Sequence, residues 1–522
     1  MPEVSPTSYD EIPYDSRAFS FTHPNRLATS AILAGLTPAP VERCRVLELG
    51  CAAGGNLLPM AEVLPESRFV GIDLSGRQIA DGQKTIDAAG LRNVELKTMS
   101  ILDVGGNLGL FDYIICHGVY SWVPPAVQDK ILDICKTNLS PNGVAYVSYN
   151  TYPGWHMRQM IREMMLYHAG GFSDPREKVR QARALLNLLV NAWEGSATGY
   201  TQVLKEELGV LGQAKDHYIF HEHLEAVNEP IYFHQFVARA AAKGLQYLNE
   251  ARPDLLWERM SPHIKQQLAP LGGDVIRREQ YQDFISSRRF RWTLLCHAGL
   301  PARHAPDPDA VGKLLVVGFL RPAAPDPDVR SAARVTFVGA HKVEVSSDDP
   351  PTKAALTILA ESHPIFLRFE VLCREVRRRL TGSADDMPED ERRRVATALL
   401  HCQQPGMVEL HAYAPPFTLE ISEYPRVTPL ARLQAAAGPL VTDLRHRDIE
   451  FKPLERVILM HLDGDHDRAA LLGVLTEAFR SGRLQAEAKT GPPPDPAAIP
   501  AILERSIEPA LRRIALNTML IG

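Results

Sequence analysis

Short apolar runs alternate with longer amphipathic stretches over the first 150 residues. The runs begin near Val46, Arg68, Asn93, Phe111 and Val144, and polar or glycine-containing turns follow them. Continuous apolar runs are typical of strands buried on both faces, and the stretches between them have helical periodicity. The pattern predicts an α/β fold in which five strand-and-helix units form a Rossmann-like domain.

The turn after the first run is the most informative segment. Glu48 ends the strand, and the chain continues through Gly50-Cys51-Ala52-Ala53-Gly54-Gly55-Asn56 into a helix. Open α/β folds bind ligands at this carboxyl edge. Dinucleotide loops seat a pyrophosphate on their glycines, whereas an acid two residues before the first glycine suits a ligand with a cationic amine. The methionine part of S-adenosylmethionine is such a ligand.

Polar residues also follow the next strands. Asp73 lies about 25 residues after Glu48, near the spacing at which such folds place a ribose-binding acid. Ser100 and Ile101 follow the third strand, where we expect contacts to an adenine. A proline-glycine turn, residues 139–143, precedes the fifth strand.

The glycine loop, the two acids and the proline-glycine turn together resemble the class I S-adenosylmethionine-dependent methyltransferases. The resemblance implies S-adenosylmethionine as the cofactor. The residues that it places at the cofactor are Tyr14, His23, Glu48, Gly50, Cys51, Ala52, Gly54, Asn56, Asp73, Leu74, Gln78, Ser100, Ile101 and Cys116.

The sequence departs from that family's pattern at two places. Ala52 and Ala53 occupy positions where glycine is commoner, although small residues still permit a close approach. Ser100 stands where an acid often contacts the adenine amine. We therefore expect adenine recognition to depend on backbone groups and on Ile101 and Leu102.

Length and composition indicate a large globular chain. Its 522 residues are too many for one core, because cores stop growing near 250–300 residues. The net charge of −5 provides no basic field for nucleic acid. Seven cysteines without paired spacing argue against a zinc ribbon or disulfide framework and favour the cytoplasm. We expect neither a signal peptide nor a membrane span.

Aromatic residues are dense before the first strand, where Tyr9, Tyr14, Phe19 and Phe21 occur. Pro24 opens an amphipathic stretch and predicts a helix. Two interpretations stay open. One is core packing under this helix, and the other is a lid that keeps water from the sulfonium of the cofactor.

A second aromatic cluster follows the fourth and fifth strands. Tyr120 and Trp122 come after the fourth strand, and Tyr152 and Trp155 surround a proline-glycine turn after the fifth. We expect these four residues to wall an acceptor pocket and His117 to form its polar end, because aromatic faces hold an amine that gains positive charge. Core packing beneath the loops is the alternative for Trp122 and Trp155.

The next part of the chain sharpens the resemblance. Residues 155–167, 225–248 and 279–297 are similar to the methyltransferase regulatory domain. With the Thr22-His23-Pro24 pattern, they resemble the bacterial protein lysine methyltransferases that modify outer-membrane proteins. We predict an S-adenosylmethionine-binding domain with an N-terminal lid over 1–165 and a helical middle domain over 166–300. A strand-containing linker over 301–345 and a winged-helix-like α+β domain over 346–522 follow.

Histidines gather at His217, His221 and His223, with His234 further on. On a helix, His217 and His221 share a face but His223 does not, and no nearby cysteine or carboxylate completes a ligand set. We expect no metal site and interpret the stretch as a helical regulatory or docking surface.

Three patterns characterise the rest of the chain. The apolar runs 313–320 and 333–338 predict a β-hairpin. Arginine triplets at 377–379 and 392–394 flank an acidic stretch, which indicates a self-compensating surface segment. Residues 454–479 resemble a helix-turn-helix, and the balanced charge around them favours protein docking over DNA binding.

The leading functional prediction is methylation of a side-chain nitrogen, with lysine first, in a protein or peptide. A large accessory mass suits a polypeptide acceptor, and we expect no nucleic-acid or membrane partner; a homodimer is compatible. One alternative is a small-molecule O- or N-methyltransferase in which His117 or His156 is the general base. Another is an S-adenosylmethionine-sensing regulator that binds DNA through residues 454–479.

Overall fold

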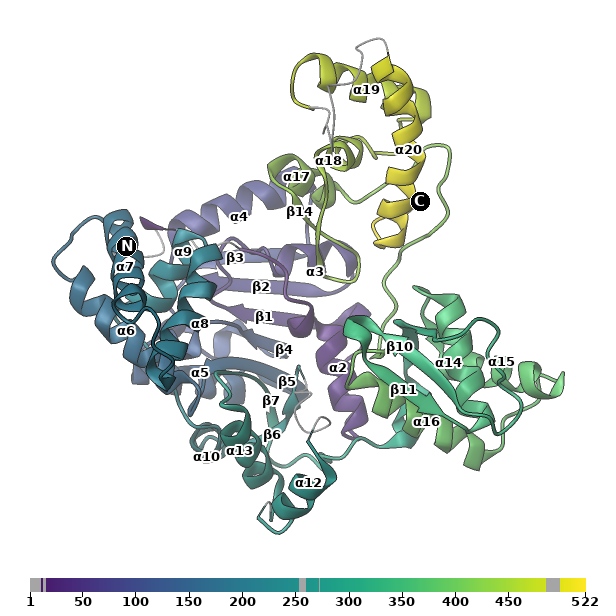
Figure 1. Cartoon of the computed structure of the whole chain (residues 1–522), viewed down its shortest axis with the longest axis horizontal. Helices are drawn as coiled ribbons and strands as arrows, with labels where there is room; N and C mark the ends of the chain where they lie inside the picture. Colours follow the sequence, from purple (N-terminus) through teal and green to yellow (C-terminus); the bar gives the residue numbers. More distant parts are fainter. Residues whose placement is uncertain (1–10, 13–15, 253–259, 272, 485–497) are drawn as a thin grey trace.

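The computed structural model describes residues 11–12, 16–252, 260–271, 273–484 and 498–522. A twisted sheet forms the centre of the molecule (Figure 1). A helical bundle lies beside one end of its strands, the unit built from residues 308–412 lies beyond the other end, and the unit built from residues 423–522 lies above the sheet in this view.

The central sheet has seven strands in the order β3-β2-β1-β4-β5-β7-β6. Their bounds are Arg45–Leu49 (β1), Arg68–Asp73 (β2), Val94–Thr98 (β3), Phe111–Cys116 (β4), Leu139–Asn150 (β5), Leu245–Glu250 (β6) and Phe290–His297 (β7). The first five are parallel, and β7 runs antiparallel to both β5 and β6. The predicted Rossmann-like fold is confirmed.

Helices cover both faces of this sheet. The helices of the first face are α2 (Pro24–Leu33), α3 (Leu57–Val63) and α4 (Gly76–Ala89), and those of the second are α5 (Pro125–Thr137) and α10 (Phe233–Ala242). Along β1, Val46 packs in the first core and Leu47 in the second, because alternate side chains of a strand point to opposite faces. Two covered faces explain the continuous apolar runs.

The middle region is mainly helical, as predicted. Its helices are α6 (Trp155–Ala169), α7 (Pro175–Ala192), α8 (Gly199–Gln213), α9 (Asp216–Ile219), the π-helical turn η6 (Phe220–Leu224), α12 (Pro262–Leu268) and α13 (Val275–Ser286). The region also supplies β6 and β7, so it completes the central sheet. The sequence patterns did not predict this contribution.

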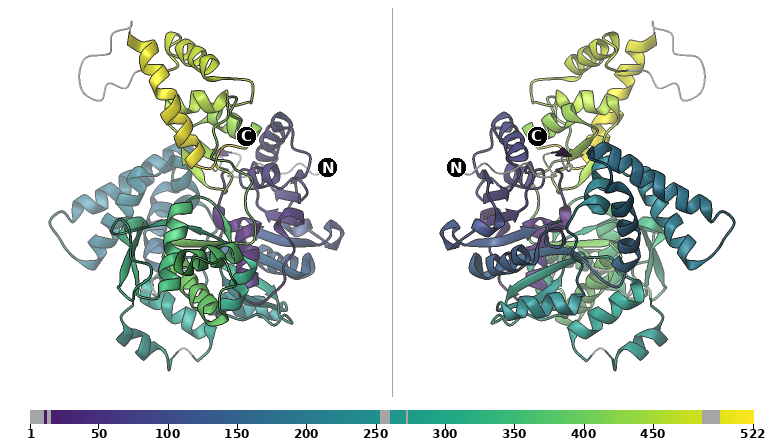
Figure 2. Two further views of the ribbon diagram at one scale, coloured as in Figure 1. Left: turned by 90° about the vertical axis from the view of Figure 1, so that its right-hand side faces the viewer. Right: turned by 90° about the vertical axis from the view of Figure 1, so that its left-hand side faces the viewer.

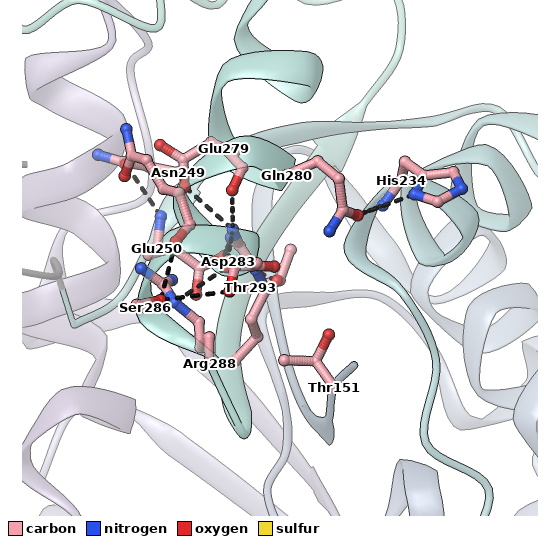
Figure 3. A network of polar contacts seen from close by, with 12 residues as sticks. Thr151, His234, Asn249, Glu250, Glu279, Gln280, Asp283, Ser286, Arg288 and Thr293 are labelled. Atoms are coloured by element: carbon pink, nitrogen blue, oxygen red, sulfur yellow. Dashed lines mark hydrogen bonds and ion pairs between the residues drawn. The ribbon is translucent and has the colours of Figure 1, made fainter. Parts of the chain in front are cut away.

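A buried ion network attaches these added strands to α13 (Figure 3). The fully buried Arg291 on β7 pairs with Asp283 at 2.8 Å, Glu250 at 2.9 Å and Glu279 at 3.2 Å. Arg288 adds a second cation beside Asp283, at 3.0 Å. Breaking such a network by removing one partner is costly, because an uncompensated buried charge remains.

Residues 308–412 form an α/β unit with its own core. Its elements are η7 (Pro308–Lys313), β8 (Leu315–Gly318), β9 (Leu320–Pro322), β10 (Val335–Gly339), η8 (Ala340–Lys342), β11 (Glu344–Ser347), α14 (Pro350–Ser362), β12 (Leu367–Arg368), α15 (Phe369–Thr381), α16 (Glu389–Gln403) and β13 (Val408–His411). The predicted hairpin of 313–320 with 333–338 is wrong: β8, the strand of the first run, pairs with β12 and β13, whereas β10 pairs with β9 and β11 in another sheet. Every arginine of the two triplets forms an ion pair with a carboxylate.

The last unit is the predicted winged helix. It contains α17 (Pro429–Ala437), β14 (Leu440–Thr442), β15 (Asp448–Glu450), α18 (Pro453–Met460), α19 (Arg468–Arg480) and α20 (Ile499–Leu516) around a separate core. Figure 2 shows α20 extending away from the central sheet. Residues 346–522 thus divide between two cores, and the domain limits at 165, 300 and 345 stay predictions. Among the described helices, none is both long and apolar enough to cross a membrane.

Candidate active site

A cavity of about 830 Å³ lies at the carboxyl edge of the parallel strands. Its volume is in the range of ligand sites. The residues predicted from the sequence that line it are Glu48, Gly50, Cys51, Ala52, Asn56, Asp73, Leu74, Gln78, Ser100, Ile101, His117 and Trp122.

Glu48 lies at the end of β1 and is 4% exposed. Its Oε1 accepts a hydrogen bond from Asn56 Nδ2 at 2.8 Å, whereas Oε2 has no hydrogen-bond partner among the described residues. Burial raises the pKa of Glu48 to about 8. A cationic amine at Oε2 would favour the ionised carboxylate, so this wall of the cavity fits the amino group of S-adenosylmethionine.

The turn after β1 is held by Asp73. Gly50 has a φ of +74°, and a Cβ there would lie 2.5 Å from the Val119 side chain. Ala52 also has a left-handed φ of +51°, and its N–H donates to Asp73 Oδ2 at 2.8 Å. Asp73 Oδ1 accepts from Ser75 N at 2.9 Å. Asp73 lines the cavity at the end of β2, where a carboxylate fits the hydroxyls of a ribose.

Two groups farther along the same edge fit the remaining part of the cofactor. Met99 and Ile101 present apolar side chains to the cavity beside Ser100. The Ser100 hydroxyl accepts from Leu102 N at 3.2 Å. Gln78 Nε2 is buried without a hydrogen-bond partner in the described structure. Apolar contacts and an available amide donor suit a nucleoside better than a charged group.

His117 lies on the cavity wall after β4. Its Nδ1 is 2.9 Å from the Tyr146 hydroxyl and 3.1 Å from Ser148 Oγ, and its ring centroid is 4.1 Å from that of Phe19. Burial, with a smaller effect of Arg17, lowers the pKa of His117 to about 3. The imidazole is therefore neutral at pH 7 and is a weak base.

The N-terminal segment closes one side of the cavity. Ser16, Arg17, Phe19 and Phe21 line it. Ser16 Oγ accepts from Gly55 N at 2.7 Å, and Phe19 N donates to Asn56 Oδ1 at 3.0 Å. The segment thus packs on the cofactor turn and walls the cavity at the same time. Tyr14 lies outside the described residues.

Three of the four aromatic residues expected in the acceptor pocket lie elsewhere. Tyr120 is fully buried against Phe236, at 5.2 Å between ring centroids, because the turn η5 (Tyr120–Trp122) directs it inward. Tyr152 stacks on His156 at 4.0 Å, away from the cavity lining. Trp155 is 1% exposed and packs edge-on against Trp122. Only Trp122 reaches the cavity, which corrects the expected placement.

Three predicted cofactor residues are also absent from the cavity lining. Cys116 is fully buried in the core at the end of β4. Gly54 has a φ of +76° and serves the turn through its backbone. His23 caps α2, since its Nδ1 accepts from Asn25 N at 3.0 Å. Their expected contact with the cofactor is not supported by this placement.

The opposite wall comes from the middle region, and the sequence patterns missed it. The residues are Tyr218, His221, Glu222, Glu225, Arg252, Phe290 and Trp292. In the sequence, the histidine-rich stretch at 217–223 was a signal for this wall. The acids Glu222, within that stretch, and Glu225, just after it, are what distinguish the wall. His221 Nδ1 lies 2.7 Å from Glu225, and His223 Nε2 lies 3.1 Å from Glu207, so both histidines pair with carboxylates.

Glu222 is the most unusual acid of that wall. Its side chain is 20% exposed and lies 3.6 Å from Arg158 Nη1. Burial raises the pKa of Glu222 to about 7, although Arg158 lowers it. A carboxyl group with this pKa exchanges a proton readily near neutral pH.

Comparisons with known proteins match the chain along its length. A methyltransferase domain model matches residues 40–222, a predicted methyltransferase regulatory domain matches 215–297, and the PKMT C-terminal winged helix domain matches 423–519. An uncharacterized protein of Rickettsia prowazekii is 36% identical over 521 residues, which cover 98% of this chain and 93% of that protein. A second uncharacterized protein of that organism is 46% identical over 241 residues, 46% of this chain and 96% of its own.

A solved structure is similar over the same length. PKMT2 from Rickettsia typhi has a TM-score of 0.84 and 33% identity, and the match covers 98% of this chain and all of that one (100%). The structure of that protein in complex with AdoHcy matches equally well, with a TM-score of 0.84.

Proposed function

Because this chain belongs to the family of S-adenosylmethionine-dependent methyltransferases with a regulatory domain and a PKMT C-terminal winged helix domain, we propose that it methylates lysine side chains. The acceptor is a protein or a peptide. The cofactor, when bound at Glu48 and Asp73, supplies a methyl group on a sulfonium sulfur.

The wall formed by the middle region carries this proposal. It lines the cavity with two acids, Glu222 and Glu225, and with the aromatic side chains of Phe290 and Trp292. Acids attract an ammonium group, and aromatic faces hold a nitrogen that becomes cationic. A lysine has the charge and the long apolar stem that such a wall accommodates.

Glu222 is the proposed proton acceptor. A lysine attacks only as the neutral amine, so its ammonium group must first lose a proton. The Glu222 carboxylate can take that proton near pH 7, whereas the pKa of His117, about 3, leaves that histidine too weakly basic. Trp122, Phe290 and Trp292 then align the amine and exclude water.

The large accessory mass supports a polypeptide acceptor. The units at 308–412 and 423–522 lie outside the cavity and add surfaces that a small metabolite does not require. A homodimer stays a prediction.

The test uses S-adenosylmethionine with an isotope-labelled methyl group, incubated with cell lysate and followed by size separation. We expect label in the protein fraction and, by mass spectrometry of its peptides, on lysine. The Asp73→Ala variant is the control for cofactor-dependent labelling. Label confined to small molecules would instead favour the natural-product alternative, and label on residues other than lysine would overturn the acceptor assignment.

A further inference from the structure

The winged-helix unit touches the cofactor turn directly. Its helix α17 packs against α3 and α4, and Leu430 N donates to Glu62 at 2.8 Å (Figure 1). The hairpin of β14 and β15, here called the wing (residues 440–450), extends from this contact. Its tip lies about 390 residues after the cofactor turn in sequence, yet it reaches Asn56.

The tip of the wing is rigidly built. His446 has a left-handed φ of +61° and is 2% exposed. The buried Asp443 carboxylate accepts from the backbone N–H groups of Arg445 at 3.0 Å and Arg447 at 2.8 Å. Arg445 also donates to Glu409 at 2.6 Å and so fixes the wing to the 308–412 unit. These contacts hold the imidazole in place.

The hydrogen bonds of Asn56 reveal what His446 does. Phe19 N can only donate, and it lies 3.0 Å from Oδ1, so this atom is the amide oxygen. Asn56 Nδ2 therefore donates, to Glu48 Oε1 at 2.8 Å and to Thr22 Oγ1 at 2.9 Å. Thr22 Oγ1 also lies 3.1 Å from Oδ1, but its one proton is donated to Phe19 O at 2.9 Å, so the amide oxygen has one further lone pair.

His446 supplies the donor for that lone pair. Its Nε2 lies 2.9 Å from Asn56 Oδ1 and must carry the proton, since an amide oxygen only accepts. Burial, with a smaller effect of His23, keeps the pKa of His446 well below its usual range, so the ring is neutral. All four hydrogen-bonding positions of the Asn56 amide are then satisfied, and the amide cannot turn without losing several bonds.

We propose that His446 is a positioning residue of the cofactor site: by fixing the Asn56 amide, it orients the Glu48 carboxylate toward the amino group of the cofactor. The winged-helix unit therefore completes the cofactor site as well as presenting an outer surface. This inference rests on the proposed role of Glu48 and not on the identity of the methyl acceptor.

The experiment compares two ligands in the full chain by calorimetry. S-Adenosylhomocysteine has the amino-acid end that Glu48 would hold, and 5′-methylthioadenosine lacks it. We expect His446→Ala to weaken the binding of S-adenosylhomocysteine about three- to tenfold, which is the effect of one lost hydrogen bond. The affinity for 5′-methylthioadenosine should stay within about twofold of the wild-type value. His446→Gln, which returns an N–H at similar reach, should restore part of the affinity.

Two further variants separate positioning from general damage. His461→Ala, in the same unit but outside the contact, should bind both ligands as the wild type does. In a Glu48→Gln background, His446→Ala should weaken the binding of S-adenosylhomocysteine by less than about a further twofold, because both changes act on one interaction. Should His446→Ala fail to fold, His446→Met, which keeps the volume without a donor, makes the same comparison.

If His446→Ala weakened the binding of both ligands equally, or left the binding of S-adenosylhomocysteine unchanged, the inference would be overturned. No binding of S-adenosylhomocysteine by the wild type would instead overturn the cofactor assignment itself.

Discussion

The two ends of the cavity are built in different ways. The cofactor end comes from successive strand ends between residues 48 and 101, each followed by a short turn. The proposed acceptor end joins the π-helical turn at 220–224 to β7 at 290–297, segments that the sequence separates by about 70 residues. A local pattern thus identifies the cofactor end, whereas the acceptor end exists only after the middle region folds onto the sheet.

The acids at the two ends also differ in their surroundings. Glu48 is held by the neutral Asn56 amide, and its Oε2 has no hydrogen-bond partner in the part of the chain that the structure describes. Glu222 faces the Arg158 guanidinium and shares it with Glu207. The surroundings of Glu48 suit a carboxylate that pairs with the ammonium group of a bound ligand. The surroundings of Glu222 suit a carboxyl group that gains and loses a proton.

The largest expected effect concerns the attachment of the middle region to the sheet. Replacing Arg291 by Met leaves Glu250 buried without its cation and leaves Asp283 with Arg288 alone, so we expect a loss of about 3–5 kcal/mol in the free energy of unfolding. Urea denaturation measures it. Arg303→Met, which breaks an exposed pair with Asp307, is the control and should cost about 1 kcal/mol or less. If Arg291→Met also lowered the free energy of unfolding by only about 1 kcal/mol or less, the result would contradict a structural role for the network.

The acceptor end is tested at Glu222. Glu222→Gln should lower the methyl-transfer rate by roughly a hundredfold and leave the affinity for S-adenosylhomocysteine nearly unchanged. Because the base must be ionised, the wild-type rate should rise with pH through about 7, and the variant should lose this limb. The exposed Glu229→Gln is the matched control. A variant with the wild-type rate and pH profile would remove Glu222 from the mechanism.

The cofactor end is tested at Asp73. Asp73→Ala removes the expected ribose contacts and the acceptor for Ala52 N, so binding of S-adenosylhomocysteine should weaken by about 1–3 kcal/mol, which is roughly 5- to 150-fold. Calorimetry measures the change. Asp81→Ala, on the exposed side of α4, should bind like the wild type. If Asp73→Ala bound S-adenosylhomocysteine as tightly as the wild type, the assignment of Asp73 as the ribose-binding acid would be wrong.

The smallest effect is expected at Tyr152. The sequence placed it in the acceptor pocket, where a large loss of rate would follow its removal. In the structure it stacks on His156 and makes a tilted contact with Tyr232 outside the cavity lining, so Tyr152→Ala should change the rate less than about threefold. Trp122→Ala, which alters the cavity wall, should lower the rate roughly tenfold or more through misalignment. A larger loss of rate for Tyr152→Ala than for Trp122→Ala would instead support the acceptor pocket that the sequence predicts.

The sequence alone determined the Rossmann-like sheet, the turn after its first strand and the two acids, Glu48 and Asp73, that line the cavity. These features depend on neighbouring residues: buried strands require continuous apolar runs, and a turn such as 50–56 requires glycines or small residues at its left-handed positions. Glu48 and Asp73 lie at the carboxyl ends of such strands, so their place at this edge of the sheet follows from chain order.

Only the tertiary structure decided the acceptor wall and the position of the wing. Tyr120 and Trp122 are two residues apart, yet one is buried in the core and the other lines the cavity, because a short 3₁₀ turn sets their directions. Glu222 and Trp292 meet in one cavity, and His446 reaches Asn56, through packing between distant segments. Such contacts leave no local period in the sequence, since burial and charge neutralisation among partners far apart select them.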